Sequence, residues 1–321
     1  MRRDSLFKSY EKCDLCPRRC GVNRRRSRET ARAGFCGESD QLRVGYVGPH
    51  FGEEPPISGD MGSGTVFLAG CSLRCAFCQN YQISHQGLGS PVALEELLLR
   101  LATLISLGHV HNINFVTPDQ FFPHVFRLVS RLREEGFDIP IVFNLSGYES
   151  LESIHMAKDY ADIYLPDYKY ANPSLAWDLS KCRDYPKVAL DAISEMVRQK
   201  GFLDACTKGG AAMAKRGVLV RHLILPGKLE NSVNALTTLF LEFGKALPLS
   251  LMSQYHPTRH QYDKDLNRFL TRDEFDRVYA HAMELGFENL FVQFPEIGSN
   301  RQSSHFPSPF LPDFQQAEPF Q

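Results

Sequence analysis

The 321-residue chain has the composition of a soluble globular protein, with 43% hydrophobic and 23% charged residues. Its formal net charge of -1 predicts no overall attraction to nucleic acid or to an anionic membrane. No apolar stretch approaches the roughly 20 residues of a membrane-spanning helix, and the charged N-terminus, MRRDSLFKSYEKCD, lacks the apolar segment of a secretory signal. We therefore expect a protein of the reducing cytoplasm, where nine cysteines indicate metal or redox chemistry rather than disulfides.

Residues 1–60 are rich in cysteine, arginine, glycine and proline and lack regular hydrophobic periodicity. We predict a small cysteine-rich, metal-binding module followed by an extended loop, GPHFGEEPPISG. Seven arginines between Arg18 and Arg32 favour a solvated basic surface, with a patch for nucleic acid or an acidic partner as the alternative. No aromatic residue lies among them, which disfavours nucleic acid.

From about residue 64 onward, short apolar runs alternate with helical patterns. The predicted strands lie at 65–70, 112–116, 139–144, 162–166, 217–225, 248–255 and 289–294. The predicted helices lie near 92–107, 121–134, 150–158, 187–200, 231–246 and 271–286. Continuous apolar strands in strict alternation with helices predict an α/β fold with a parallel sheet, closed into a partial (β/α) barrel over residues 61–300.

In a barrel of this kind the active-site groups gather where strands end, at the carboxyl edge of the sheet. Seven residues fall at or just after such ends: Cys71, Asn144, Asp167, Pro226, Gly227, Tyr255 and His256. Residues 301–321 contain four prolines and no periodicity, so we expect a tail that lies on the surface or is disordered.

Three cysteines, Cys71, Cys75 and Cys78, follow the first of these strands in the spacing C-x3-C-x2-C. A structural zinc site usually has four protein ligands, whereas three thiolates can hold a four-iron cluster and leave one iron free. The free iron could bind a small chelating molecule and pass it an electron. The spacing therefore favours an iron-sulfur site, with structural zinc as the alternative.

These cysteines carry a resemblance to a known superfamily. Their spacing, with Phe77 before the last cysteine and a barrel strand before the first, resembles the radical S-adenosylmethionine (SAM) superfamily. More narrowly, FLAGCSLRCAFCQNYQIS, CDLCPRRCGVNR and GFCGE resemble uncharacterised iron-sulfur proteins described as pyruvate formate-lyase activating enzyme-like, over about residues 13–300. The resemblance implies a [4Fe-4S] cluster and reductive cleavage of SAM to a 5′-deoxyadenosyl radical, which abstracts hydrogen from a substrate that the sequence does not identify.

The resemblance also implies where SAM is held. The family's Gly-Gly-Glu-Pro segment corresponds to FVTPDQF, in which only Pro118 is retained and Thr117 or Asp119 would hold the amino group. The family's Asp-Thr-Asn-Gly turn corresponds to NLSGY, which places Asn144 and Ser146 at polar cofactor contacts.

Three further residues are catalytic candidates through the same resemblance. PDYKY matches the family's Asp-Leu-Lys segment, so Asp167 and Lys169 would bind the cofactor carboxylate and order the site. A simple ion pair between them is the alternative. RHLILPG matches the strand before a Val-Pro-Gly turn near the adenine, and QYHP matches the last active-site loop, with His256 as its functional side chain. A lone histidine of this kind is often only structural.

Four cysteines form a second set near the N-terminus. Cys13, Cys16, Cys20 and Cys36 have the spacing C-x2-C-x3-C-x15-C, which is enough to close a metal site with no open position. The spacing allows zinc or an iron-sulfur cluster, and nearby arginines would offset the charge of the thiolates. Four thiols without metal are the alternative.

The loop HFGEEPPISG places Glu53 and Glu54 just before the first strand. These acids could close over the site or move a proton, but a solvated structural loop is as good an interpretation. The resemblance implies SAM, an electron donor such as flavodoxin or ferredoxin, and a glycyl radical enzyme or other protein substrate as partners. Two alternatives are an iron-sulfur sensor that binds SAM without turnover and an RNA-modifying enzyme recruited through the arginine-rich module.

Overall fold

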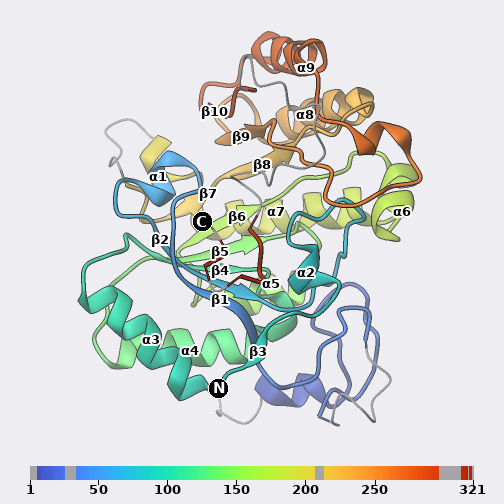
Figure 1. The fold of residues 1–321 in the computed structure, drawn as a ribbon. Coiled ribbons are helices and arrows are strands. Elements are labelled where there is room, and N and C mark those ends of the chain that lie inside the picture. Colours follow the sequence, from blue (N-terminus) through green and yellow to red (C-terminus); the bar gives the residue numbers. More distant parts are fainter. Residues whose placement is uncertain (1–5, 26–33, 207–212, 296–311, 317, 320–321) are drawn as a thin grey trace.

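A parallel sheet forms the centre of the computed structural model, which describes residues 6–25, 34–206, 213–295, 312–316 and 318–319 (Figure 1). Two groups of parallel strands make up this sheet. The first is β2 (Ser63–Leu68), β4 (Ile113–Val116), β5 (Ile141–Leu145), β6 (Ile163–Pro166) and β7 (Gly217–Val218), and the second is β8 (Val220–Leu223), β9 (Leu249–Met252) and β10 (Leu290–Val292). A parallel bridge between Asp167 and Arg221 joins the groups, so the predicted strand at 217–225 is present as β7 and β8.

Helices cover the outside of this sheet, as the alternating pattern predicts. The six predicted helices are α3 (Leu94–Ser106), α4 (Phe122–Glu134), α5 (Leu151–Ala157), α7 (Tyr185–Lys200), α8 (Leu229–Phe243) and α9 (Arg272–Leu285). All residues of β2, β4, β5 and β6 are buried, which explains their continuous apolar sequences. The α/β partial-barrel prediction is confirmed.

Local signals fix several helix ends. The Ser150 hydroxyl accepts from the Ser153 amide at the start of α5, and Thr271 and Glu274 form a capping box at the start of α9. The sequence prediction missed one eight-residue helix and several short ones. These are α1 (Pro55–Ser58), α2 (Tyr81–Ser84), α6 (Pro173–Ser180) and the 3-10 helices η1 (Leu6–Tyr10), η2 (Asp119–Phe121), η3 (Asp204–Cys206) and η4 (Lys264–Asn267).

Part of the expected N-terminal module belongs to the sheet. Strand β1 (Arg43–His50) pairs antiparallel with β2, and β3 (Ser90–Pro91) pairs with the other edge of β1. The sequence RVGYVGPH hides this strand because its two glycines and its proline resemble a loop. The sheet ends at β3 on one side and at β10 on the other, so the barrel is open between them.

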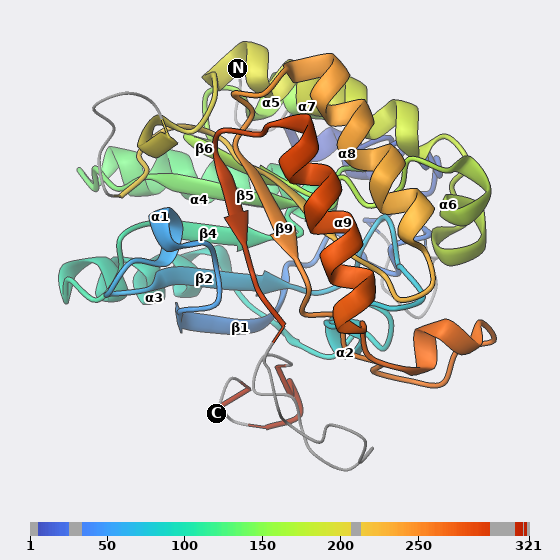
Figure 2. The same cartoon turned by 90° about the horizontal axis from the view of Figure 1, so that it is seen from above.

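The loop after β1 crosses the barrel at the end where the strands begin. His50 pairs with Ser63, the first residue of β2, and the chain then passes through the short helix α1 before β2 starts. Figure 2 shows α1 beside the starting ends of β2 and β4. Ile57 of α1 is fully buried in a cluster with Val142 and Leu165. The loop therefore forms a floor for the barrel.

The described arginines of the N-terminal module are of two kinds: Arg19 and Arg25 are exposed, as expected of a solvated surface, whereas Arg18 and Arg24 are not. Arg24 is buried, and its guanidinium donates to the carbonyls of Gln120 and Ser39, both at 2.7 Å. The Arg18 guanidinium donates to the carbonyl of Ser72 at 3.0 Å. Both side chains attach the module to the barrel, whereas Arg26, Arg28 and Arg32 lie outside the described residues.

The described part of the C-terminal segment also differs from the expected surface tail. Phe314 is buried against Phe67, Ile83 and Val116, and its amide donates to the Gln82 side chain at 2.8 Å. The segment thus packs against the open side of the barrel, because an aromatic side chain gains more from this apolar site than from solvent. In the described part of the chain, no helix is long and apolar enough to cross a membrane.

Candidate cofactor site

A cavity of about 870 Å³ lies inside the barrel, and Cys71, Cys75 and Cys78 line one end of it. Cys71 and Cys75 are buried, whereas Cys78 is half-buried. Phe77 holds the loop by packing on Tyr170 and Tyr255, each with ring centroids 6.3 Å away. The structure therefore brings the three predicted ligands together at the ends of the strands.

The surroundings of these thiols fit a bound iron-sulfur cluster. The amides of Leu73 and Arg74 point at the Cys71 sulfur, at 3.3 and 3.4 Å, as donors to a thiolate do. Burial, followed by Asp119 and the other two cysteines, raises the pKa of Cys71 well above its usual value. Three neighbouring thiolates, two of them buried, would therefore need a compensating positive charge, which iron would supply.

The arrangement of these thiols is compatible with a cluster. Among the described residues, no three His, Cys, Asp or Glu side chains are arranged to hold a single metal ion. In a four-iron cluster each thiolate binds a different iron, so the sulfurs need not converge on one point.

The turn after β4 has an unusual backbone. Thr117 lines the cavity and has a φ of 55°, a left-handed conformation that a β-branched residue rarely adopts. Its amide donates to the Asn144 carbonyl at 2.9 Å, and its carbonyl accepts from the Gln120 side chain at 2.8 Å. The backbone thus keeps a conformation that favours glycine, although the chain has no glycine at this position.

A network of buried charges crosses the cavity below the cysteines. The Arg221 guanidinium donates to Asp167 at 2.9 Å, to Glu53 at 3.0 Å and to the Asn144 side-chain oxygen at 2.6 Å. The Lys169 ammonium pairs with the second oxygen of Asp167. Although burial acts in the opposite direction, Arg221 and Lys169 hold the pKa of Asp167 below its usual value. The ion-pair interpretation of Asp167 and Lys169 is thus observed, and both residues also line the cavity.

The other predicted SAM contacts are divided between the cavity and its surroundings. Ser146 lines the cavity, and its hydroxyl donates to Glu149 at 3.1 Å. Asp119 is fully buried but is not among the lining residues, and its neighbours include Cys16 and Cys36. His256 packs against Phe269, with ring centroids 5.1 Å apart, and does not line the cavity either. We therefore leave Asp119 and His256 out of the proposed site.

The N-terminal cysteines lie against the same end of the barrel. Cys13 is buried, and the Arg24 guanidinium approaches its sulfur at 3.8 Å, as the prediction of charge compensation requires. Cys16 and Cys36 each have a pKa raised by burial, and Cys13 adds to both shifts. The Phe35 amide donates to the Cys20 sulfur at 3.4 Å. Cys13, Cys16 and Cys36 thus influence one another. Cys20 bonds to Phe35, the residue before Cys36.

Two residues of the charge network were missed in the sequence. Arg221 lies in the middle of an apolar strand, GVLVRHLIL, and Asn114 lies in another, NINFV. The Asn114 side chain donates to Glu53 at 2.9 Å. The signal in the sequence was the polarity itself, because a polar residue inside an apolar barrel strand must face a partner in the interior.

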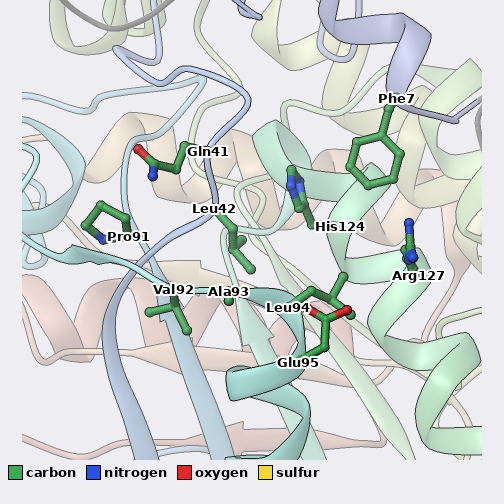
Figure 3. Close-up of a pocket in the computed structure, with 10 residues that line it drawn as sticks. All are labelled: Phe7, Gln41, Leu42, Pro91, Val92, Ala93, Leu94, Glu95, His124 and Arg127. Carbon is green, nitrogen blue, oxygen red and sulfur yellow. The ribbon is translucent and has the colours of Figure 1, made fainter.

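A second, more open cavity of about 450 Å³ lies outside the barrel, between the N-terminal helix η1 and the helices α3 and α4 (Figure 3). His124 and Arg127 of α4 and Phe7 of η1 lie along one side of it. Burial, then Arg24 and Arg127, lowers the pKa of His124 to about 4, and its ring bonds the Tyr10 hydroxyl at 2.9 Å. None of the described cysteines lines this cavity.

A family model supports the interpretation of the barrel and its cysteine loop. The model of the radical SAM superfamily matches residues 65–232, which is more than half of the chain. This chain belongs to the radical SAM superfamily. Members of this superfamily typically carry a [4Fe-4S] cluster and bind SAM.

Similar proteins do not supply a substrate. The chain is 26% identical over 291 residues to "Uncharacterized protein MJ0674" of Methanocaldococcus jannaschii, covering 88% of this chain and 77% of that protein. Among solved structures, methylornithine synthase has a TM-score of 0.44 at 14% identity, covering 76% of this chain and 77% of that one. A domain of pyruvate-formate lyase-activating enzyme from Bacteroides vulgatus has a TM-score of 0.40 at 10% identity, covering 57% of this chain and 99% of that one.

Proposed function

We propose that this protein is an enzyme that cleaves SAM reductively at a [4Fe-4S] cluster held by Cys71, Cys75 and Cys78. When bound, the cluster and SAM supply an electron and a 5′-deoxyadenosyl radical, which abstracts a hydrogen atom from the substrate. One observation carries this proposal: these three are the only cysteines among the described residues that line the interior cavity. Three thiolates leave one iron of a four-iron cluster without a protein ligand.

Residues around the cavity provide suitable groups for SAM. The Thr117 carbonyl, in its left-handed turn, would accept from the amino group of the methionine moiety. Lys169 has three ammonium donors and uses one for Asp167, so the others would meet the methionine carboxylate. Asn144 is already bonded to Glu53 and Arg221, so we assign it to ordering the site rather than to direct contact.

We propose that the four N-terminal cysteines hold a second iron-sulfur cluster rather than zinc. A single zinc ion needs ligands that converge on one point, and the described residues contain no such group. The buried Arg24 beside Cys13 supplies a fixed positive charge next to these thiols. The Cys16→Ala variant described in the Discussion tests this assignment by metal analysis.

The volume of the cavity bears on the size of the substrate. The cavity volume of about 870 Å³ is near the upper end of the range of about 300–1,000 Å³ for small-molecule sites, which leaves room for SAM and a small substrate. A glycyl radical enzyme as the substrate remains the prediction from resemblance. The buried position of Arg24 weighs against the RNA-modifying alternative, because this residue is not accessible to a nucleic acid.

The test is product formation by the anaerobically reconstituted and chemically reduced protein. We expect 5′-deoxyadenosine and methionine in equal amounts, and neither product from Cys75→Ala. If the wild-type protein retains an intact cluster and binds SAM but forms no 5′-deoxyadenosine, the enzyme proposal fails and the sensor alternative takes its place.

A further inference from the structure

Two adjacent acids, Glu53 and Glu54, line the end of the cavity opposite the cysteines. They follow β1, whose last residue pairs with the first residue of β2, whereas Cys71 comes just after the end of β2. A strand of six residues spans roughly 20 Å. The acids and the cluster ligands therefore lie at two well-separated ends of the same cavity.

The charges that line this cavity do not balance. Apart from the cysteines, the described lining residues include three carboxylates, Glu53, Glu54 and Asp167, and two fixed cations, Lys169 and Arg221. Arg221 pairs with Glu53 and Asp167, and Lys169 pairs with Asp167. The three carboxylates outnumber the two cations by one. Glu54 is the carboxylate that forms no ion pair with either cation.

His50 does not supply the missing charge. It also lines the cavity, but burial is the largest influence on its pKa and lowers it from the usual value. Arg221 acts in the same direction, while Glu53 opposes it. Burial and Arg221 thus disfavour the charged form of the ring.

Glu54 is an unusual residue in its own right. Only 9% of its surface is exposed, and its Oε2 atom is buried without a hydrogen-bond partner among the described residues. Burial raises the pKa of Glu54. Arg221 opposes this shift without forming an ion pair, and hydrogen bonds from the Ser250 hydroxyl and from the Glu54 backbone amide oppose it as well. A buried, unmatched carboxylate destabilises the protein that contains it. Glu53 beside it is fully bonded, to Asn114, Asn144 and Arg221, and suffices to fasten the loop.

We propose that Glu54 binds a cationic group of the substrate, an alkylammonium or a guanidinium. This inference rests on the proposed function, which places the reacting carbon of the substrate toward the cysteine end of the cavity. The cationic group of the substrate would lie at the opposite end, at the floor of the barrel. The cation belongs to the substrate rather than to SAM, because the methionine moiety of SAM would be held at the cysteine end, beside Thr117 and Lys169. The substrate is thus a compound with a positive charge remote from its reacting carbon.

Protein stability distinguishes a binding role from a structural one. Glu54→Gln replaces a buried acid that has no ion-pair partner by a neutral amide, so the melting temperature of the substrate-free protein should rise by about 2 °C. Glu53→Gln is the matched control, because it breaks the ion pair with Arg221 and should lower the melting temperature by about 5 °C or more. A fall in Glu54→Gln comparable to that in Glu53→Gln would show that Glu54 is structural and would overturn the proposal.

Ligand binding gives a second test that does not depend on turnover. We would titrate the reconstituted protein calorimetrically with n-hexylamine, n-hexylguanidine, n-hexanol and hexanoate at pH 7. One or both of the cations should bind, the alcohol and the acid should not, and Glu54→Gln should weaken the binding by about tenfold or more. Equal binding of the alcohol, unchanged binding to Glu54→Gln, or no binding of either cation would overturn the proposal.

Two further arms define the source of the cation and the dependence on SAM. A blocked Gly-Lys-Gly peptide that binds as n-hexylamine does assigns the subsite to a lysine side chain, whereas binding of the free amine alone assigns it to a small substrate. Saturating SAM should leave amine binding intact. Competition between SAM and the amine would show that the amine occupies the SAM site, which would overturn the inference. SAM cleavage is measured in parallel: cleavage without amine binding contradicts this inference alone, and amine binding without cleavage contradicts the proposed function alone.

Discussion

The carbonyl of Cys36 lies so close to Gly70 that a Cβ on Gly70 would stand 2.8 Å from its oxygen and 2.4 Å from Cγ of Glu38. Gly70 directly precedes Cys71, and Cys36 is the last cysteine of the N-terminal set. The two cysteine groups, separated by 35 positions in the sequence, therefore meet at one glycine. The N-terminal module therefore packs directly on the residue before the cysteine loop and is not an independent appendage.

Replacing this glycine should separate the module from the cysteine loop. Gly70 has a φ of +75°, so Gly70→Ala adds both backbone strain and a steric clash, and we expect a loss of about 3 kcal/mol in unfolding free energy. Gly108→Ala is the matched control, because Gly108 has a φ of +66° and no atom of the described residues lies within 4 Å of where its Cβ would be. This control should lose about 1 kcal/mol. Urea unfolding measures both values, and equal losses would contradict the close contact.

The two cysteine groups should respond differently to substitution. Cys75→Ala should remove the iron held in the cavity together with its visible absorbance, because two thiolates do not retain the cluster. Cys16→Ala should lose only the iron of the N-terminal set and keep the absorbance of the other cluster. Cys206→Ala is the control, because Cys206 lies in η3 and its pKa is raised by burial and by Asp204 rather than by a cysteine of either group. Elemental analysis that finds zinc, lost specifically from Cys16→Ala, would contradict the second cluster.

The sequence predicted the fold well because its signal is local. Each barrel strand is a buried apolar run between helical patterns, so its position follows from hydrophobicity alone. The cysteine loop was equally accessible through its spacing. The partnership of Glu53 with Arg221 was not, because 168 positions separate them and only the closed barrel brings them together. The same applies to Arg24, whose buried partners lie on η2 and on the loop before β1.

Arg24 should contribute to stability rather than to nucleic-acid binding. Arg24→Ala removes the donor to the buried Gln120 carbonyl and to the half-buried Ser39 carbonyl, and we expect a loss of about 3 kcal/mol in unfolding free energy. Arg25→Ala is the control, because Arg25 is exposed and pairs with Glu11, and should change stability by less than about 1 kcal/mol. Salt-dependent RNA binding that falls in Arg25→Ala would revive the RNA-modifying alternative.

The neutral histidine beside the second cavity predicts a pH dependence of stability. The pKa of His124 is lowered to about 4 in the folded protein, against about 6.5 in the unfolded chain. Between these values the unfolded state binds more protons, so stability should fall as the pH drops from about 6.5 to about 4, by about 2 to 3 kcal/mol from this residue. Below about pH 4 the folded and the unfolded state both bind this proton, so His124 causes no further fall in stability.

His124→Gln should flatten this part of the stability profile, measured by urea unfolding at several pH values. His85 and His222 also have a pKa lowered to about 4, mainly by burial, so some slope should remain in the variant. His109→Gln, at an exposed position, should keep the slope of the wild-type protein. An unchanged slope in His124→Gln would show that His124 does not titrate as the structure indicates.

Thr117 has a left-handed backbone conformation, so we expect its replacement by glycine to stabilise the protein, although the residue lies in the proposed cofactor site. A non-glycine residue in this conformation costs about 1–3 kcal/mol, whereas the added flexibility of glycine costs less than about 1 kcal/mol. Thr117→Gly should therefore raise the unfolding free energy by about 1 kcal/mol, while Thr65→Gly, at a buried position within β2, should lower it. Because the backbone at 117 already has the conformation that glycine favours, SAM affinity measured by equilibrium dialysis should change less than about threefold. A larger loss would show that the threonine side chain, rather than its backbone, contacts the cofactor.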